Sequence, residues 1–210
     1  MSELLASMIP SSLSYTLPLV PLFLFFWLMQ HRSNRTLVAE SEIEAKAEAK
    51  EVALKMLKLT GIEDVAVEKS DNYSQNDFDE TEQKILLSPD TFDQKDLTAI
   101  GLAARAVGKA IFSRQAPDEA KLLGTIKHSL LISFWIVFTV LAFGLMANSP
   151  ITILVGYGLI ALMLLFVVIQ IRLEFGVNRR VKELLDQTNA LDEQEKNGVH
   201  RVLRAEAMKF

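Results

Sequence analysis

The sequence predicts a mainly α-helical membrane protein, with three transmembrane helices and a small cytoplasmic α+β cap. The first observation is that half of the 210 residues are hydrophobic and that many of them gather in three uncharged runs. The second is that a long polar stretch, residues 30–128, separates the first run from the other two. The third is a pair of short strand patterns within that stretch, which predicts a cap made of a helix and a β-hairpin.

Two of the uncharged runs predict membrane spans by length alone, because a helix needs roughly 20 apolar residues to cross a bilayer. They occupy residues 129–147 and 151–171. The remaining run, residues 13–29, is shorter and contains two prolines. No small-residue cleavage site follows it, as a signal peptide would require, and the basic segment 31–35 comes next instead. We therefore expect an N-terminal signal anchor at 13–29, after a tail at 1–12.

The charged residues beside the three spans predict their orientation, because cytoplasmic flanks carry an excess of lysine and arginine. The tail at 1–12 carries one acid, Glu3, and the connection at 147–150 carries no charge. We therefore expect an external N-terminus, an external hairpin, and cytoplasmic regions at 30–128 and 172–210. The basic residues behind this prediction are His31, Arg32, Arg35, Lys121, Lys127, Arg172, Arg179, Arg180 and Lys182.

Within the cytoplasmic region, residues 38–59 are rich in good helix formers, with glutamates four residues before lysines. This pattern predicts one long helix. Strands are expected at 65–68 and 83–88, on either side of an acidic loop at 69–82. Two such short strands do not form a stable sheet domain by themselves, so we expect a hairpin packed on a helix that covers about 95–112.

Polar residues mark the ends of the remaining helices. Asp93 is a candidate N-cap for the helix at 95–112. After the third span we expect the helix to continue to Gln187, followed by a turn at Asn189 and a final helix at about 192–208.

The composition argues against several classes of function. The chain has no cysteine, so disulfides, a thiol nucleophile and cysteine-based metal sites are excluded. A formal net charge of −4 argues against a nucleic-acid partner. The three histidines, His31, His128 and His200, are far apart, so no H-x-x-x-H pair exists.

The helix at 95–112 carries two cations on a stripe of small and apolar residues. Arg105 and Lys109 are four residues apart, which is about one helical turn, so both project from the same face. One interpretation is that they are solvated cations. The other is that they occupy positions where a related protein has different residues, and a resemblance favours the second interpretation.

Several segments, in order, resemble the bacterial membrane neutral zinc metallopeptidases of the YugP type. The similarity extends over residues 30–207 and implies a bacterial inner membrane protein built on a zinc-peptidase scaffold. The segments are TGIEDVAVE at 60–68, NDFDETEQKILLS at 76–88, AARAVGKAI at 103–111, LEFGVNRRVKELL at 173–185 and LDEQEKNGVHRVLRAEA at 191–207.

The chain departs from this family where the family's chemistry resides. The resemblance implies an H-E-x-x-H helix, in which two imidazoles bind zinc and the glutamate acts as general base. The corresponding residues here are Arg105, Ala106 and Lys109. Arginine only donates hydrogen bonds, lysine binds a metal only after losing its proton, and alanine has no carboxylate. By the same resemblance Glu174 corresponds to the third metal ligand, and Asp77 to a histidine of the family's turn.

These departures predict no zinc, no other cofactor and no peptidase activity. We expect Arg105 or Lys109 to form an ion pair with Glu174, so that a salt bridge takes the place of the metal, because an unpaired buried carboxylate is costly. The alternative for Glu174 is a juxtamembrane acid that faces water.

The leading functional hypothesis is a catalytically inactive, metallopeptidase-like membrane protein that serves as a binding, scaffold or regulatory subunit. The alternative is an accessory or assembly subunit of a membrane transport or respiratory complex. A peptidase with a rearranged site is a third hypothesis, although the chain lacks a histidine pair, a cysteine and a G-x-S-x-G motif. The expected partner is another integral membrane protein or membrane complex, or a second copy of the chain.

Overall fold

The computed structural model describes residues 15, 17, 19–73, 75–188 and 190–209. The predicted tail at 1–12, the start of the predicted span at 13–29 and the turn at Asn189 therefore lie outside the described residues. The chain divides into two compact units. One unit combines the described residues up to Met29 with Gly124–Gln170, and the other combines Gln30–Leu123 with Ile171–Phe210. As predicted, the structure is mainly α-helical with one small sheet.

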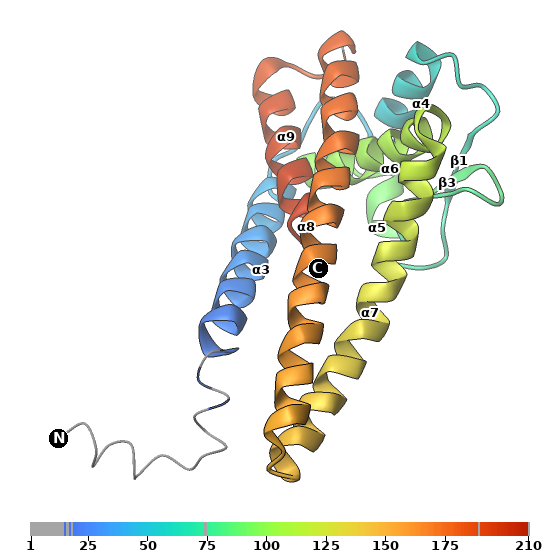
Figure 1. Cartoon of the computed structure of the whole chain (residues 1–210). Coiled ribbons are helices and arrows are strands. Elements are labelled where there is room, and N and C mark those ends of the chain that lie inside the picture. The colour runs from blue at the N-terminus through green and yellow to red at the C-terminus, as the bar shows by residue number, and fades with distance from the viewer. Residues whose placement is uncertain (1–14, 16, 18, 74, 189, 210) are drawn as a thin grey trace. The chain divides into compact units, whose positions relative to one another are not determined.

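Two helices among the described residues are long and apolar enough to cross a membrane, rather than the three predicted. They are α7 (Pro117–Met146) and α8 (Pro150–Gln187), which a short turn joins into an antiparallel hairpin (Figure 1). The prediction of a third span fails on the described part of α3 (Leu19–Ser41). Its apolar part ends near Met29, so at about 1.5 Å per residue it is shorter than the roughly 30 Å hydrocarbon core.

Close packing within the hairpin depends on a glycine of α8. A Cβ atom added at Gly156 would lie 2.4 Å from Cδ2 of Leu141 on α7, so no larger residue fits without displacement. Beyond its apolar run α8 continues without a break to Gln187, as predicted for this part of the chain.

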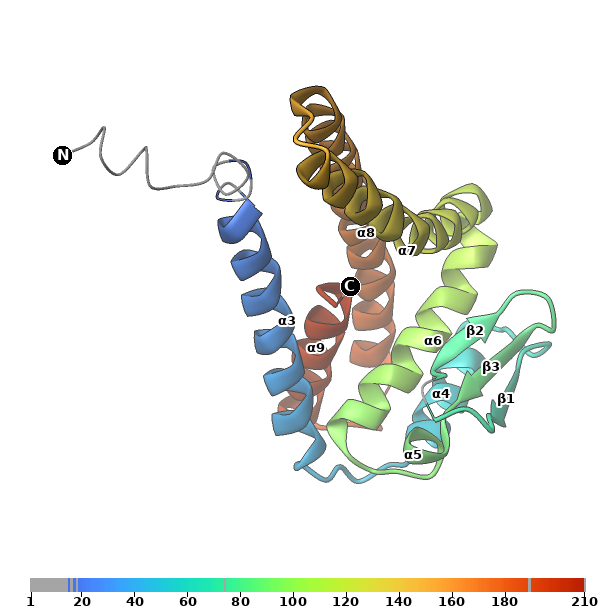
Figure 2. The same cartoon turned by 90° about the horizontal axis from the view of Figure 1, so that it is seen from below.

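The unit that contains Gln30–Leu123 is built around α6 (Leu97–Gln115). Figure 2 shows α6 with α4 (Ala49–Leu59) and the sheet on one side and α9 (Glu193–Ala207) on the other. Because α6 is covered on both sides, most of its residues are buried, small ones included. The core side chains of α6 and of the elements around it include Val52, Met56, Ile85, Ile100, Val107, Phe112, Val177, Val181 and Val199.

The sheet has three strands rather than the predicted two-stranded hairpin. Its strands are β1 (Ala66–Lys69), β2 (Asp77–Asp79) and β3 (Lys84–Leu87), in the order β1-β3-β2. The two predicted strands pair in parallel, and β2, from the predicted acidic loop, pairs antiparallel with β3. The connection from β1 to β3 is long enough to return the chain to the start of the sheet, which a parallel pair requires.

The predicted helix at 38–59 is interrupted. The backbone between α3 and α4 bonds instead to the chain before α6, with Ala45 N–H donating to Lys95 C=O and Leu97 N–H to Ile43 C=O. The N-cap of α6 is Asp96, whose side chain accepts the Ala99 N–H at 2.8 Å.

The predicted cap Asp93 has a different role, because its carboxylate pairs with Lys50 and Lys69. A short helix, α5 (Pro89–Phe92), precedes it. In α9 the side chain of Asp192 accepts the backbone N–H of Glu195, and the side chain of Glu195 accepts that of Asp192, which forms a capping box close to the predicted helix start.

Candidate functional site

A glycine of α6, Gly108, brings the helix that carries Arg105 and Lys109 close to the neighbouring helix α8. A Cβ atom added at Gly108 would lie 2.2 Å from Cγ2 of Val181 and 3.0 Å from Cγ1 of Val177. The two helices therefore approach each other to a distance that only glycine permits here. This approach lets a side chain of α6 reach Glu174, which lies one helical turn before Val177 and Asn178 on α8.

Arg105 and Glu174 form a buried, two-point ion pair. Arg105 Nη2 donates to Glu174 Oε1 at 2.6 Å, and Nε donates to Oε2 at 3.2 Å. The side chains are 9% and 2% exposed. Such a fork-to-carboxylate arrangement is the strongest common type of charge-assisted hydrogen bond and fixes orientation as well as distance.

A second acid, Glu206 of α9, adds to this ion pair. Its Oε2 lies 3.9 Å from Arg105 Nη1, so one guanidinium is shared by acids from two helices. Burial by itself lowers the pKa of Arg105, but the charges of Glu174, Glu206 and Asp77 together raise it above its ordinary value. Arg105 therefore stays a cation in this site at any pH at which the protein folds.

Lys109 pairs with a different acid. Its Nζ lies 2.5 Å from both carboxylate oxygens of Asp77 on β2. The Lys109 side chain is 13% exposed and that of Asp77 is 46% exposed. Of the two cations, Arg105 is thus the one that contacts Glu174, and both are enclosed by the fold rather than solvated.

The side chains at this site do not fit a zinc ion. Arg105 has only N–H donors, and both oxygens of Glu174 already accept hydrogen bonds from it. His200 is on α9, and its charged neighbours are Lys182, Asp186, Glu193 and Lys196. Within the described part of the chain, no three His, Asp or Glu side chains are arranged to hold a metal.

Glu206 is the site residue that sequence reasoning missed. A helical pattern could have identified it, because Val199, Val202, Leu203 and Glu206 occupy positions i, i+3, i+4 and i+7, which share one helix face. An acid on such a face indicates a buried cationic partner, since a lone buried carboxylate is unfavourable.

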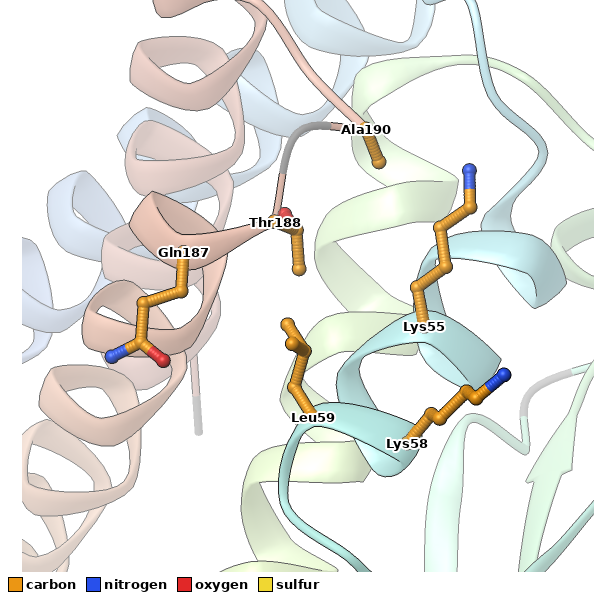
Figure 3. Close-up of a pocket in the computed structure, with 6 residues that line it drawn as sticks. All are labelled: Lys55, Lys58, Leu59, Gln187, Thr188 and Ala190. Atoms are coloured by element: carbon orange, nitrogen blue, oxygen red, sulfur yellow. The ribbon is translucent and has the colours of Figure 1, made fainter.

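A pocket of about 440 Å³ lies elsewhere in the same unit, between the C-terminal end of α4 and the chain that follows α8. Leu59 and Thr188 face each other across it, whereas the amino groups of Lys55 and Lys58 point away from the hollow (Figure 3). None of the predicted site residues lines this pocket. It is therefore separate from the ion pairs of α6.

The chain is similar to known proteins over most of its length. Residues 15–210 match the family described as "Putative neutral zinc metallopeptidase". A relative in Bacillus subtilis (strain 168), "Putative membrane protease YugP", is 24% identical over 195 residues, which cover 92% of this chain and 87% of the relative. No solved structure matches the chain. The resemblance found in the sequence is confirmed at the level of the family.

Proposed function

Since the chain belongs to the neutral zinc metallopeptidase family, we propose that it is a catalytically inactive member that spans a membrane and acts by binding another membrane protein. The observation that carries this proposal is the buried ion pair of Arg105 with Glu174. Its guanidinium engages the one carboxylate that corresponds, by the family resemblance, to a metal ligand.

The residues of this site cannot perform the family's expected chemistry. Hydrolysis at a zinc site uses a metal-bound water and a general base. Arg105 and Lys109 supply positive charge but no free lone pair, and Ala106 supplies no base. The fixed cation instead balances Glu174, whose charge would be costly to bury alone.

The membrane part of the proposal is supported by two helices and by a relative. The uncharged runs of α7 and α8 are long enough to cross a bilayer, and the relative is described as a membrane protease. The basic residues beside these runs favour an external hairpin and a cytoplasmic location for the unit that contains α6. Because the relative is a bacterial protein described as a membrane protease, we place the chain in a bacterial inner membrane.

The binding role is supported by the surface of the unit that contains α6. Leu54 and Leu59 of α4 are half exposed, and Leu59 lines the pocket beside Lys55 and Lys58. Exposed apolar side chains beside a hollow are typical of a contact surface for a partner. A transport or respiratory complex is the alternative partner, and the nature of the co-purified complex separates the two hypotheses.

Zinc content and peptide cleavage test the loss of activity. We expect the full chain, purified in mild detergent, to contain no stoichiometric zinc and to cleave no peptide. The matched variant is Arg105→His/Ala106→Glu/Lys109→His, which restores the metal-binding residues and is expected to bind zinc with Glu174. Stoichiometric zinc in the unmodified protein, or cleavage that a chelator abolishes, would contradict the proposal.

A further inference from the structure

The nine arginines of the chain fall into two groups according to their partners. Five have a carboxylate, amide or aromatic partner: Arg105, Arg114, Arg179, Arg180 and Arg201. The other four are Arg32, Arg35, Arg172 and Arg204. They are exposed, and their side chains form no ion pair or hydrogen bond with any described residue.

These four arginines, the arginine band, lie on three helices of one compact unit. Arg32 and Arg35 are on α3, Arg172 is on α8, and Arg204 is on α9. Figure 2 shows α9 between the parts of α3 and α8 that belong to this unit. The four guanidinium groups therefore belong to neighbouring helices, although they are far apart in the sequence.

Contacts along α9 fix the positions of these residues along the helix axes. Ser33 Oγ donates to Ala205 C=O, and Arg201 pairs with Glu40, so α9 runs antiparallel to α3. Asn178 Nδ2 donates to Leu203 C=O at 2.8 Å, and Lys196 Nζ lies 3.4 Å from Asp186 C=O, so α9 also runs antiparallel to α8.

These pairings place the four arginines in a narrow band. Arg35 lies level with Arg204, and Arg32 and Arg172 lie level with the last residues of α9. At about 1.5 Å of rise per residue, the four Cα atoms fall within roughly 10 Å along the helix axes.

The apolar runs of α3 and α8 end at the same level along the helix axes as the arginine band. The run of α3 ends at Met29, three residues before Arg32, and that of α8 ends at Ile171, next to Arg172. The boundary between the two compact units falls at the same positions on both helices. In a bilayer, residues at the end of an apolar run lie among the lipid headgroups.

Nearby acids do not neutralise the band. Glu40 is engaged by Arg201, and Glu174 by Arg105. Glu206 lies between Arg105 and Lys209. Each of these acids therefore already faces a cation outside the band, and the charge of the four exposed guanidinium groups remains available to an external anion.

We propose that the arginine band binds the phosphate groups of anionic phospholipids in the leaflet next to the unit that contains α6. A guanidinium group matches the geometry of a phosphate and donates two hydrogen bonds to it. Basic clusters next to a membrane helix attract anionic lipids, with a gain in affinity for each cation. This inference rests on the membrane insertion proposed above.

Lipid titration of the full chain tests the inference. Phosphatidylglycerol or phosphatidylcholine is added to the protein in neutral detergent, and bound lipid is counted by native mass spectrometry. We expect a preference for phosphatidylglycerol that falls roughly fivefold for each arginine removed in Arg32→Gln/Arg35→Gln/Arg172→Gln. The matched control is Arg179→Gln, because Arg179 is an exposed arginine of α8 that already pairs with Glu183.

Several outcomes would overturn the inference. Equal binding of the two lipids, or an undiminished preference in a triple variant that keeps the wild-type circular dichroism spectrum, would show that the band does not select anionic lipids. Displacement of the lipid by an equal concentration of inorganic phosphate would indicate a site for free anions instead. If the triple variant no longer bound an acidic protein partner but kept the lipid preference, the band would be assigned to that partner.

Alkaline extraction of cell membranes separates this inference from the proposed function. Protein released by the treatment would contradict both membrane insertion and lipid binding. Protein that stays in the membrane but shows no lipid preference would contradict the arginine band alone. The measurements of zinc content and peptide cleavage, which test the loss of activity, do not depend on either result.

Discussion

Arg105 and Lys109 lie one turn apart on the same helix, yet their ion pairs differ in almost every respect. Arg105 makes two hydrogen bonds to a carboxylate that is 2% exposed, between two packed helices. Lys109 contacts Asp77, which lies on an edge strand and whose side chain is 46% exposed. Because water screens the second pair and not the first, the same charge contributes very differently to stability.

The largest effect is expected from Arg105→Ala, which leaves the buried Glu174 carboxylate without its main partner. Breaking a buried pair in this way costs roughly 3–5 kcal/mol, so we expect the free energy of unfolding in denaturant to fall by that amount. The variant Arg105→Met/Glu174→Leu removes both charges and is expected to recover most of the loss. An Arg105→Ala protein as stable as the wild type would contradict the buried pair.

A smaller effect is expected from Gly108→Ala, which separates α6 from α8 rather than removing a charge. The added Cβ would lie 2.2 Å from Cγ2 of Val181, and overpacking of this kind costs about 1–3 kcal/mol. Gly124→Ala is the matched control, because nothing lies within 4 Å of a Cβ atom at that helical position. We expect Gly124→Ala to be neutral or slightly stabilising in the same denaturation experiment. Equal losses in the two variants would contradict close packing at Gly108.

A modest effect is expected from Asp77→Asn, which alters the more exposed of the two ion pairs. The variant keeps a polar side chain but removes the charge that faces Lys109, and such half-exposed pairs contribute about 1 kcal/mol or less. Added salt is expected to reduce the difference from the wild type. A loss as large as that of Arg105→Ala would show that Lys109 depends on Asp77 as strongly as Arg105 depends on Glu174.

The smallest effect concerns an exposed acid, Asp192. Its carboxylate accepts the backbone N–H of Glu195 and pairs with Lys46, and both contacts hold its pKa below the usual value. A lowered pKa in the folded state gives stability at neutral pH that is lost as the pH falls below about 4. We expect Asp192→Ala to lower the melting temperature slightly at pH 7, and by progressively less as the pH falls below about 4. A difference from the wild type that does not change as the pH falls would exclude a role for the carboxylate charge.

Local signals in the sequence were sufficient to predict α8 and α9. An uncharged run defines the first part of α8, and Asp192 followed by Glu195 marks the start of α9. The break between Ser41 and Ala49 was not predictable in this way, because it depends on hydrogen bonds to residues 94–97. The prediction of a two-stranded sheet was wrong because β2 is only three residues long and lies within an acidic segment.

The site shows the same division between local and distant information. The family resemblance drew attention to Arg105, Lys109 and Glu174, but it left open which cation contacts the acid. That choice depends on how closely α6 approaches α8 at Gly108, which the sequence alone does not specify. The contribution of Glu206 depends in turn on where α9 packs against α6.

The ion pair of Arg105 with Glu174 also bears on how the protein matures in a cell. Both side chains belong to the polypeptide itself, so the charges of Arg105 on α6 and Glu174 on α8 are balanced as soon as the chain folds. A zinc-dependent protein must first obtain its ion from the cellular pool. Growth under zinc starvation is therefore expected to leave the amount of this protein unchanged.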